Sequence, residues 1–154
     1  MRVYCAGPLF SQAERAFLGS CAARLRAAGL ECFLPHEEAL GVSGATAERV
    51  FSVDLDGLAR AHALLAWLDG PVVDDGTACE IGVFYGLMQR GGFPRKGIVG
   101  LVTDLRLQRR RAGVEEAGLN LFVAGAIRRA GGICWSLDDA LAQLLAWKRE
   151  LDAV

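Results

Sequence analysis

Ala63-Leu-Leu-Ala-Trp-Leu68, followed by Asp69-Gly-Pro-Val-Val-Asp-Asp-Gly-Thr-Ala-Cys-Glu-Ile-Gly82, is the stretch of sequence that decides the fold. The first run is apolar and long enough for one buried strand, which ends before the break at Pro71. A helix-compatible apolar run, Ala78 to Met88, comes next. We therefore expect a strand, a short junction and a helix that carries Glu80 in its first turn.

Carboxylates crowd this junction between strand and helix: Asp74, Asp75 and Glu80 all lie close to it in sequence. In an open parallel α/β sheet, ligands bind outside the carboxyl ends of the strands, so a binding site is predicted here. Acidic residues also favour helix caps and first turns, because they complement the helix macrodipole. Capping needs only one such residue, so the cluster favours a ligand site over capping alone.

Apolar runs and helix-compatible segments alternate along the rest of the chain. Strands are predicted at 2–6, 30–34, 63–68, 98–102 and 133–135, and helices at 12–28, 46–61, about 76–90, 119–129 and 137–151. Loops are predicted over 36–45 and most of 104–118. This alternation predicts an α/β fold with a doubly wound, five-stranded parallel sheet, flavodoxin- or Rossmann-like, in the order 2-1-3-4-5. No linker or internal repeat divides the chain, so residues 1–154 are interpreted as a single domain.

The composition narrows the possible classes of function. A hydrophobic fraction of 53% can bury one sizeable core, and a net charge of −1 argues against a nucleic acid or a membrane surface as partner. No apolar run is long enough to cross a bilayer, and the protein is expected to be cytoplasmic. The basic cluster Arg106-Leu-Gln-Arg-Arg-Arg-Ala112 is interpreted as a solvated loop. No glycine-rich dinucleotide or triphosphate fingerprint occurs, and no cofactor is expected.

Cysteine and histidine usage gives no sign of a metal site. The number of cysteines, 5, is odd and no C-x-x-C pair occurs, so we expect reduced thiols that are buried as small hydrophobic side chains. His36 and His62 are too isolated to bind a metal together. Cys79, next to Glu80, is a candidate nucleophile, but no histidine lies near it in sequence to activate it.

Four segments occur in an order that resembles one enzyme family. They are Tyr4-Cys-Ala-Gly-Pro-Leu-Phe10, Asp54-Leu-Asp-Gly-Leu58, Asp74-Asp-Gly-Thr-Ala-Cys-Glu-Ile-Gly82 and Gly118-Leu-Asn-Leu-Phe122. With them the chain resembles the nucleoside 2-deoxyribosyltransferases over nearly its whole length. The resemblance implies transfer of 2-deoxyribose between nucleobases, with net retention, through a glycosyl ester of a glutamate. This is the two-carboxylate chemistry of retaining glycosidases.

The resemblance also implies a role for each candidate residue. Glu80 would be the nucleophile, Tyr4 would orient it, and Asp54 would be the acid that protonates the departing base, which requires a raised pKa. Asp74 would hold the 5′-hydroxyl of the sugar. Asn120 would reach into the site of a neighbouring subunit, which implies a homo-oligomer, dimer-based and up to a hexamer. The other substrate-binding residues that the resemblance implies are Gly7, Phe10, Gly76 and His36.

The chain departs from the family pattern in two places. The residue types of His36-Glu-Glu38 differ from those of the loop that touches the base in relatives, so the preference between purines and pyrimidines stays open. The segment Leu151-Asp-Ala-Val154 lacks the aromatic tail that some members place in the adjoining site. The expected substrates are deoxynucleosides and free nucleobases.

Two alternative functions compete with the transferase. The first is a deoxynucleoside 5′-monophosphate N-glycosidase, which passes the sugar to water. In that related family a serine at the position of Asp74 helps to hold the phosphate, whereas a carboxylate would repel it. The second is a non-enzymatic flavodoxin-like module that binds a nucleotide or a partner protein, with the carboxylates serving only as helix caps and Asp54 as a solvated helix residue.

Overall fold

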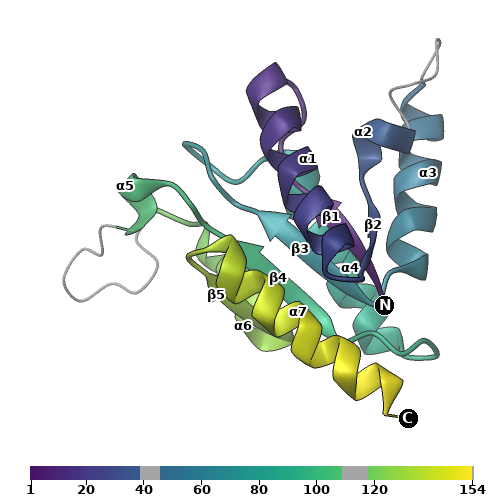
Figure 1. Cartoon of the computed structure of the whole chain (residues 1–154). Coiled ribbons are helices and arrows are strands. Elements are labelled where there is room, and N and C mark those ends of the chain that lie inside the picture. The colour runs from purple at the N-terminus through teal and green to yellow at the C-terminus, as the bar shows by residue number, and fades with distance from the viewer. Residues whose placement is uncertain (39–45, 109–117, 154) are drawn as a thin grey trace.

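The computed structural model describes residues 1–38, 46–108 and 118–153 (Figure 1). The strands are β1 (Arg2–Ala6), β2 (Glu31–Phe33), β3 (Ala63–Trp67), β4 (Gly97–Leu101) and β5 (Gly131–Cys134). The helices are α1 (Gln12–Ala27), α2 (Pro35–Glu38), α3 (Ala47–Arg60), α4 (Asp75–Arg90), α5 (Leu105–Gln108), α6 (Leu121–Ala130) and α7 (Leu137–Asp152).

The strands form one sheet in the order β2-β1-β3-β4-β5, and every pairing is parallel. The predicted fold class and strand order are therefore confirmed. Tyr4 of β1 pairs with Phe33 on one side and with Leu64 on the other. Chain order reverses at β1 and β3, which makes the carboxyl ends of these two strands the topological switch point where ligands bind in such sheets.

Helices cover both faces of the sheet (Figure 1). One face packs against α1 and α7, and the other against α3, α4 and α6. Because side chains alternate along a strand, Val3 and Cys5 point to the α1 side while Tyr4 and Ala6 point to the α4 side. The alternation thus turns Tyr4 toward the helix that carries Glu80.

Helix caps follow their sequence signals closely. Ser11 and Glu14 form a capping box at the start of α1. At its end, Gly29 takes a φ of +82°, a left-handed conformation in which glycine has no steric penalty. Asp74 caps α4 and Asn120 caps α6, each through its own side-chain oxygen. Both of these predicted ligand-binding residues therefore also have a structural role.

Several predicted boundaries were wrong, for physical reasons. Pro35 does not simply end the second strand; it opens the short helix α2 inside the predicted loop, since proline suits the first helical position. Helix α4 begins at Asp75, so Glu80 lies in its second turn and not in its first. Helix α6 begins at Leu121, because Asn120 takes the N-cap position that precedes the helix.

Two predictions fall partly outside the described residues. The predicted loop over 36–45 is described only to residue 38, and the basic cluster only to Gln108. Within the described part of that cluster, Arg106 makes an ion pair with Asp104. No helix among the described residues is both long and apolar enough to cross a membrane.

Candidate functional site

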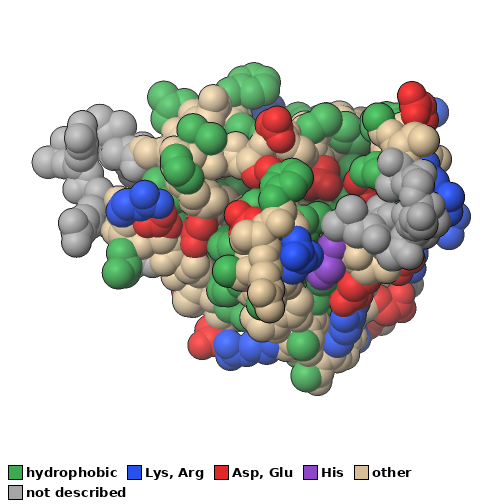
Figure 2. Space-filling model, turned by 90° about the horizontal axis from the view of Figure 1, so that it is seen from above, with side chains coloured by type: hydrophobic (Ala, Val, Ile, Leu, Met, Phe, Trp, Pro, Cys, Tyr) green, Lys and Arg blue, Asp and Glu red, His purple; other side chains and the backbone are tan. Residues whose placement is uncertain are grey.

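A pocket of about 260 Å³ opens at the carboxyl-terminal edge of the sheet. Figure 2 looks onto this end of the molecule and shows acidic side chains gathered near its centre among hydrophobic ones. The pocket is lined by Gly7, Leu9, Phe10, Pro35, Val50, Asp54, Asp74, Gly76, Thr77 and Glu80. The structure thus brings six of the nine predicted site residues to one cavity. A seventh, Tyr4, contacts it through Glu80.

Tyr4 and Glu80 are 76 positions apart in sequence, and they meet where Glu80 lines this pocket. The Tyr4 side chain is fully buried, and its hydroxyl donates a hydrogen bond of 2.5 Å to Oε1 of Glu80. A bond this short is typical of a hydroxyl that donates to a carboxylate. Tyr4 itself is held by Phe33, whose ring stacks on it with centroids 5.0 Å apart. The sheet therefore fixes the orientation of the Glu80 carboxylate.

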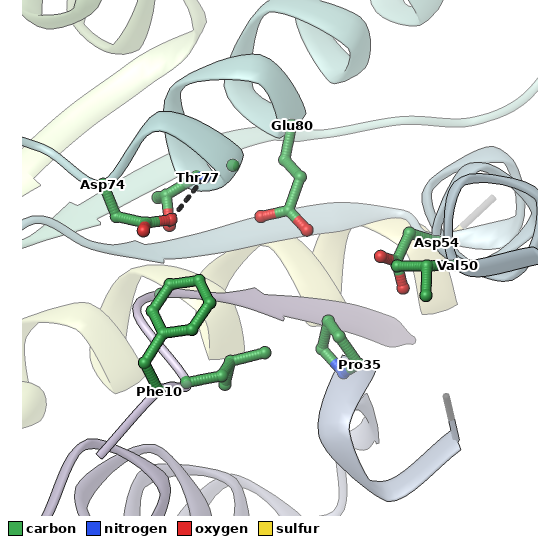
Figure 3. A pocket seen from close by; sticks show the side chains of 10 residues that line it. Phe10, Pro35, Val50, Asp54, Asp74, Thr77 and Glu80 are labelled. Carbon is green, nitrogen blue, oxygen red and sulfur yellow. Dashed lines mark hydrogen bonds between the residues drawn. The ribbon is translucent and has the colours of Figure 1, made fainter. Parts of the chain in front are cut away.

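Asp54 reaches the pocket because α3 packs closely on the sheet. Gly57, one turn further along α3, faces the Phe33 ring, and a β-carbon at this position would lie 2.7 Å from the ring. Glycine therefore permits the close approach, and Asp54 points from α3 toward Glu80 (Figure 3). The glycine in the segment Asp54-Leu-Asp-Gly-Leu58 thus has a packing role.

Burial changes the acid–base properties of Asp54. Its Oδ1 is buried without a hydrogen-bond partner among the described residues. Burial disfavours the charged form and raises the pKa of Asp54 to about 6, from an ordinary value of 3.8. A carboxyl group with this pKa holds a proton near neutral pH in part of the molecules, as a general acid must.

The pKa of Glu80 is also shifted from its ordinary value. Burial, together with the negative charges of Asp54 and Asp74, raises its pKa to about 7, while the hydrogen bond from Tyr4 lowers it. The same burial and the neighbouring Glu80 raise the pKa of the Tyr4 hydroxyl, so Tyr4 remains a donor. Glu80 and Asp54 titrate in the same range and their negative charges repel, so between about pH 6 and pH 7 the pair shares about one proton.

The adjacent carboxylates Asp74 and Asp75 differ in their surroundings. Asp75 is exposed, and its Oδ1 accepts a hydrogen bond from the backbone of Gly76. Asp74 is half-buried, and its Oδ2 accepts hydrogen bonds from the backbone N–H and the hydroxyl of Thr77. Figure 3 shows the Asp74 carboxylate in the pocket with Glu80, beside the ring of Phe10. Of the predicted acidic cluster, Asp75 is only a helix-terminal residue.

Comparisons with known proteins identify the family of the chain. The sequence profile of one family, described as nucleoside 2-deoxyribosyltransferase, matches residues 3–122. The chain belongs to this family. The family is enzymatic, and the resemblance on the four sequence segments is confirmed. A search of curated proteins gave no match.

Solved structures share the fold of this deoxyribosyltransferase-family chain. A conserved protein from Enterococcus faecalis V583 is 28% identical, with a TM-score of 0.78 over 97% of this chain and 98% of that one. A 2-deoxyribosyltransferase from Bacillus psychrosaccharolyticus is 20% identical, with a TM-score of 0.65 over 92% of this chain and 90% of that one. The CMP N-glycosidase BcmB from Clostridium botulinum is 16% identical, with a TM-score of 0.55 over 94% and 98% of the two chains.

Two residues predicted from the family resemblance do not line the pocket. His36 lies in α2 beside the pocket residue Pro35, and its Nδ1 is buried without a partner among the described residues. Asn120 lines a different cavity, of about 380 Å³, with Val72 and Leu119. The Oδ1 of Asn120 accepts hydrogen bonds from two backbone N–H groups of its own helix. Neither side chain lines the pocket at the sheet edge within this one chain.

A second hollow, of about 400 Å³, adjoins the pocket of this family member. It runs between α3 and α4, shares Asp54 and Glu80 with the pocket, and is otherwise mainly apolar. Cys79 lines it and is exposed, which corrects the expectation that the cysteines are buried. The other cysteines are buried or half-buried, and all are free thiols. No group of residues in the described part of the chain could hold a metal ion.

The sequence-based prediction missed several pocket residues: Leu9, Pro35, Val50 and Thr77. The apolar members carry no chemical signal in sequence, because apolar side chains of this kind are far more often core residues. Thr77, in contrast, does have a sequence signal. It is the third helical residue after a capping aspartate, the position whose backbone N–H such a cap accepts from.

Proposed function

We propose that this protein transfers 2-deoxyribose from one nucleobase to another by a double displacement with net retention. The observation that carries the proposal is the pairing of Glu80, held by the buried Tyr4, with Asp54, whose buried Oδ1 has no hydrogen-bond partner among the described residues. Family membership supports the same chemistry. No metal or cofactor is needed for it.

In the first displacement, an oxygen of Glu80 forms a bond to the anomeric carbon as the N-glycosidic bond breaks. The electron pair of the breaking bond leaves with the base, which takes a proton from Asp54. Burial raises the pKa of Asp54, which lets it hold a proton, and the hydrogen bond from Tyr4 lowers the pKa of Glu80 and so opposes the effect of burial on Glu80. In the second displacement, a nitrogen of the incoming base attacks the anomeric carbon, Glu80 leaves as carboxylate, and Asp54 takes the proton from the base.

The substrate is proposed to be a deoxynucleoside and not its 5′-phosphate. Asp74 places a carboxylate at the end of the pocket beyond Glu80, where it can accept a hydrogen bond from a 5′-hydroxyl (Figure 3). A dianionic phosphate in the same place would be repelled. The apolar side chains of Phe10, Pro35 and Val50 offer an uncharged nucleobase a surface to lie against.

Hydrolysis is the second candidate, because water in place of the incoming base would release free 2-deoxyribose from the same intermediate. One structural comparison supports hydrolysis as the second candidate, since a CMP N-glycosidase has the same fold. Asp74 argues against a nucleotide substrate of that kind. Hydrolysis of an unphosphorylated nucleoside would use every residue in the proposed roles.

Asn120 is proposed to act in the site of a second copy of the chain. Within one chain it lies outside the pocket, in a neighbouring cavity, while its exposed neighbours Leu121 and Phe122 are 67% and 88% accessible. Exposed apolar residues next to Asn120 are suited to contact between subunits. The protein is therefore proposed to be a homo-oligomer, with His36 near the base as a further binding residue.

Mixing 2′-deoxyinosine with free adenine and following the bases by chromatography tests the proposal. Formation of 2′-deoxyadenosine supports the transferase, free 2-deoxyribose supports the hydrolase, and no turnover leaves the binding module. Glu80→Ala should remove activity by several orders of magnitude, as for other covalent nucleophiles. Asp75→Ala is the matched control, because Asp75 starts the same helix but is exposed and does not line the pocket. Retention of more than about a tenth of the rate in Glu80→Ala would remove Glu80 from this role.

A further inference from the structure

Thr77 is a polar residue with only 1% of its surface accessible, buried at the start of α4. Its backbone N–H donates a hydrogen bond of 2.9 Å to Oδ2 of Asp74, which already caps the helix. Its hydroxyl donates a second bond, also of 2.9 Å, to the same oxygen. The helix start requires only the first of these bonds, so the second has another consequence.

The second bond restricts the Asp74 carboxylate. Glycine at residue 76 leaves Oδ2 room in this position, because a β-carbon there would lie only 3.3 Å from that oxygen. Since Oδ2 accepts both bonds from Thr77, the carboxylate cannot exchange its two oxygens without breaking two hydrogen bonds. Its other oxygen, Oδ1, accepts no hydrogen bond from the described residues and is left for a ligand in the pocket.

We propose that Thr77 is a positioning residue that aims Oδ1 of Asp74 at the 5′-hydroxyl of the substrate. This role rests on the proposed function. A carboxylate with one free oxygen accepts one hydrogen bond from a neutral donor, and fixing its rotation before binding removes an entropic penalty from substrate binding. Thr77 therefore contributes to the selection of a 5′-hydroxyl without contacting it.

Thr77→Val and Thr77→Ser separate this role from a purely structural one. Valine keeps the shape and the backbone N–H that caps α4 but lacks the hydroxyl, whereas serine keeps the hydroxyl. Each variant is assayed with 2′-deoxyinosine and with 2′,5′-dideoxyinosine, which lacks the 5′-hydroxyl, and adenine is the acceptor. With 2′-deoxyinosine, valine should lower kcat/KM about tenfold, mainly through KM, as expected when a hydrogen bond to a charged group is lost. Serine should stay within about twofold of the wild type.

The dideoxy substrate decides the outcome. With 2′,5′-dideoxyinosine the wild type and Thr77→Val should have equal kcat/KM, because this substrate offers Asp74 no 5′-hydroxyl to bind. Equal losses on both substrates, or no loss on either, would overturn the role of Thr77 while leaving the proposed function intact. If the wild type neither turns over nor binds 2′-deoxyinosine in calorimetry, the proposed function fails and this role fails with it.

Gly76→Ala provides an independent route should Thr77→Val not fold, as judged by thermal unfolding. Its β-carbon would press on Oδ2 of Asp74 at 3.3 Å and displace the carboxylate by a few tenths of an ångström. The ratio of kcat/KM for 2′-deoxyinosine to kcat/KM for the dideoxy substrate is expected to fall, as for Thr77→Val. A loss of equal size on the dideoxy substrate would contradict the proposal.

Discussion

Replacing Glu80 by glutamine is expected to make the protein more stable above neutral pH while ending its activity. The Glu80 carboxyl is largely buried between Tyr4 and two other carboxyl groups, Asp54 and Asp74. Ionisation of Glu80 in this place opposes folding. Glutamine has nearly the same shape, cannot ionise, and can still accept the hydrogen bond from the Tyr4 hydroxyl.

The magnitude follows from the pKa of Glu80. It is raised from 4.5 to about 7, so the folded protein binds the proton more tightly than the unfolded chain does. The stability that this proton contributes is complete below pH 4.5 and is lost as the pH rises through 7. At about 1.4 kcal/mol for each pH unit, the loss is about 1 kcal/mol at pH 5 and about 3 kcal/mol at pH 8.

Thermal unfolding of wild type and Glu80→Gln at pH 5 and pH 8 measures this difference. For a domain of this size, about 3 kcal/mol corresponds to a midpoint higher by roughly 10 °C at pH 8, and the gain should be a third as large at pH 5. Asp75→Asn is the control. The Asp75 carboxylate is exposed at the start of the same helix. The unfolding midpoint of Asp75→Asn should therefore stay close to that of the wild type at both pH values.

Two results would refute the reasoning. If Glu80→Gln were less stable than wild type at pH 8, the Glu80 carboxylate would be favourably placed and not strained by burial. If the gain were the same at pH 5 and pH 8, it would come from packing and not from ionisation, because only ionisation changes with pH in this range.

The remaining predictions concern the other pocket residues. Asp54→Asn should slow transfer from natural bases about 10²–10⁴-fold but affect an activated leaving group much less, because only the former needs a proton; equal slowing of both donors in parallel assays would be evidence against an acid role. Tyr4→Phe should lower kcat/KM about 10–100-fold, and the acid limb of its pH profile should move to higher pH, because the Tyr4 hydroxyl lowers the pKa of Glu80; an unmoved limb would contradict this. Asp74→Ser keeps a good helix cap and should raise turnover of 5′-monophosphates relative to nucleosides, since like charges ~4 Å apart repel by about 4 kcal/mol at an effective dielectric of 20. If the wild type already preferred the monophosphate, the role of Asp74 and the transferase assignment would both fail.

The fold could be predicted from sequence because its signals are local. The apolar runs in Ala63–Trp67 and Gly97–Leu101 are buried on both faces of the sheet, and they show the continuous hydrophobicity that such strands require. Alternation with helices then allows few topologies, because crossovers between parallel strands are right-handed. The predictions were wrong at element boundaries, where two local preferences compete. Pro35, for example, is as well suited to begin a helix as to end a strand.

The candidate site was only partly contained in the sequence. Sequence motifs selected Glu80, Asp54 and Asp74 as residue types in the right order, and only the family resemblance preferred Asp74 to the neighbouring Asp75. The tertiary structure gives a physical reason for that preference, because the direction of each side chain at a helix start decides which one enters the pocket and which one faces solvent. Asn120, equally well supported by its motif, lies outside the pocket of its own chain.

The chemistry of the site depends on distances between residues that are remote in sequence. The 2.5 Å bond from Tyr4 to Glu80 exists because parallel pairing sets β1 beside β3 and side-chain alternation turns Tyr4 toward α4. The raised pKa of Asp54 exists because α3 packs on Phe33 at Gly57 and takes that carboxyl out of water. Sequence determined which groups are present, whereas burial and contact, which depend on the whole fold, decided which of them can hold or lose a proton near neutral pH.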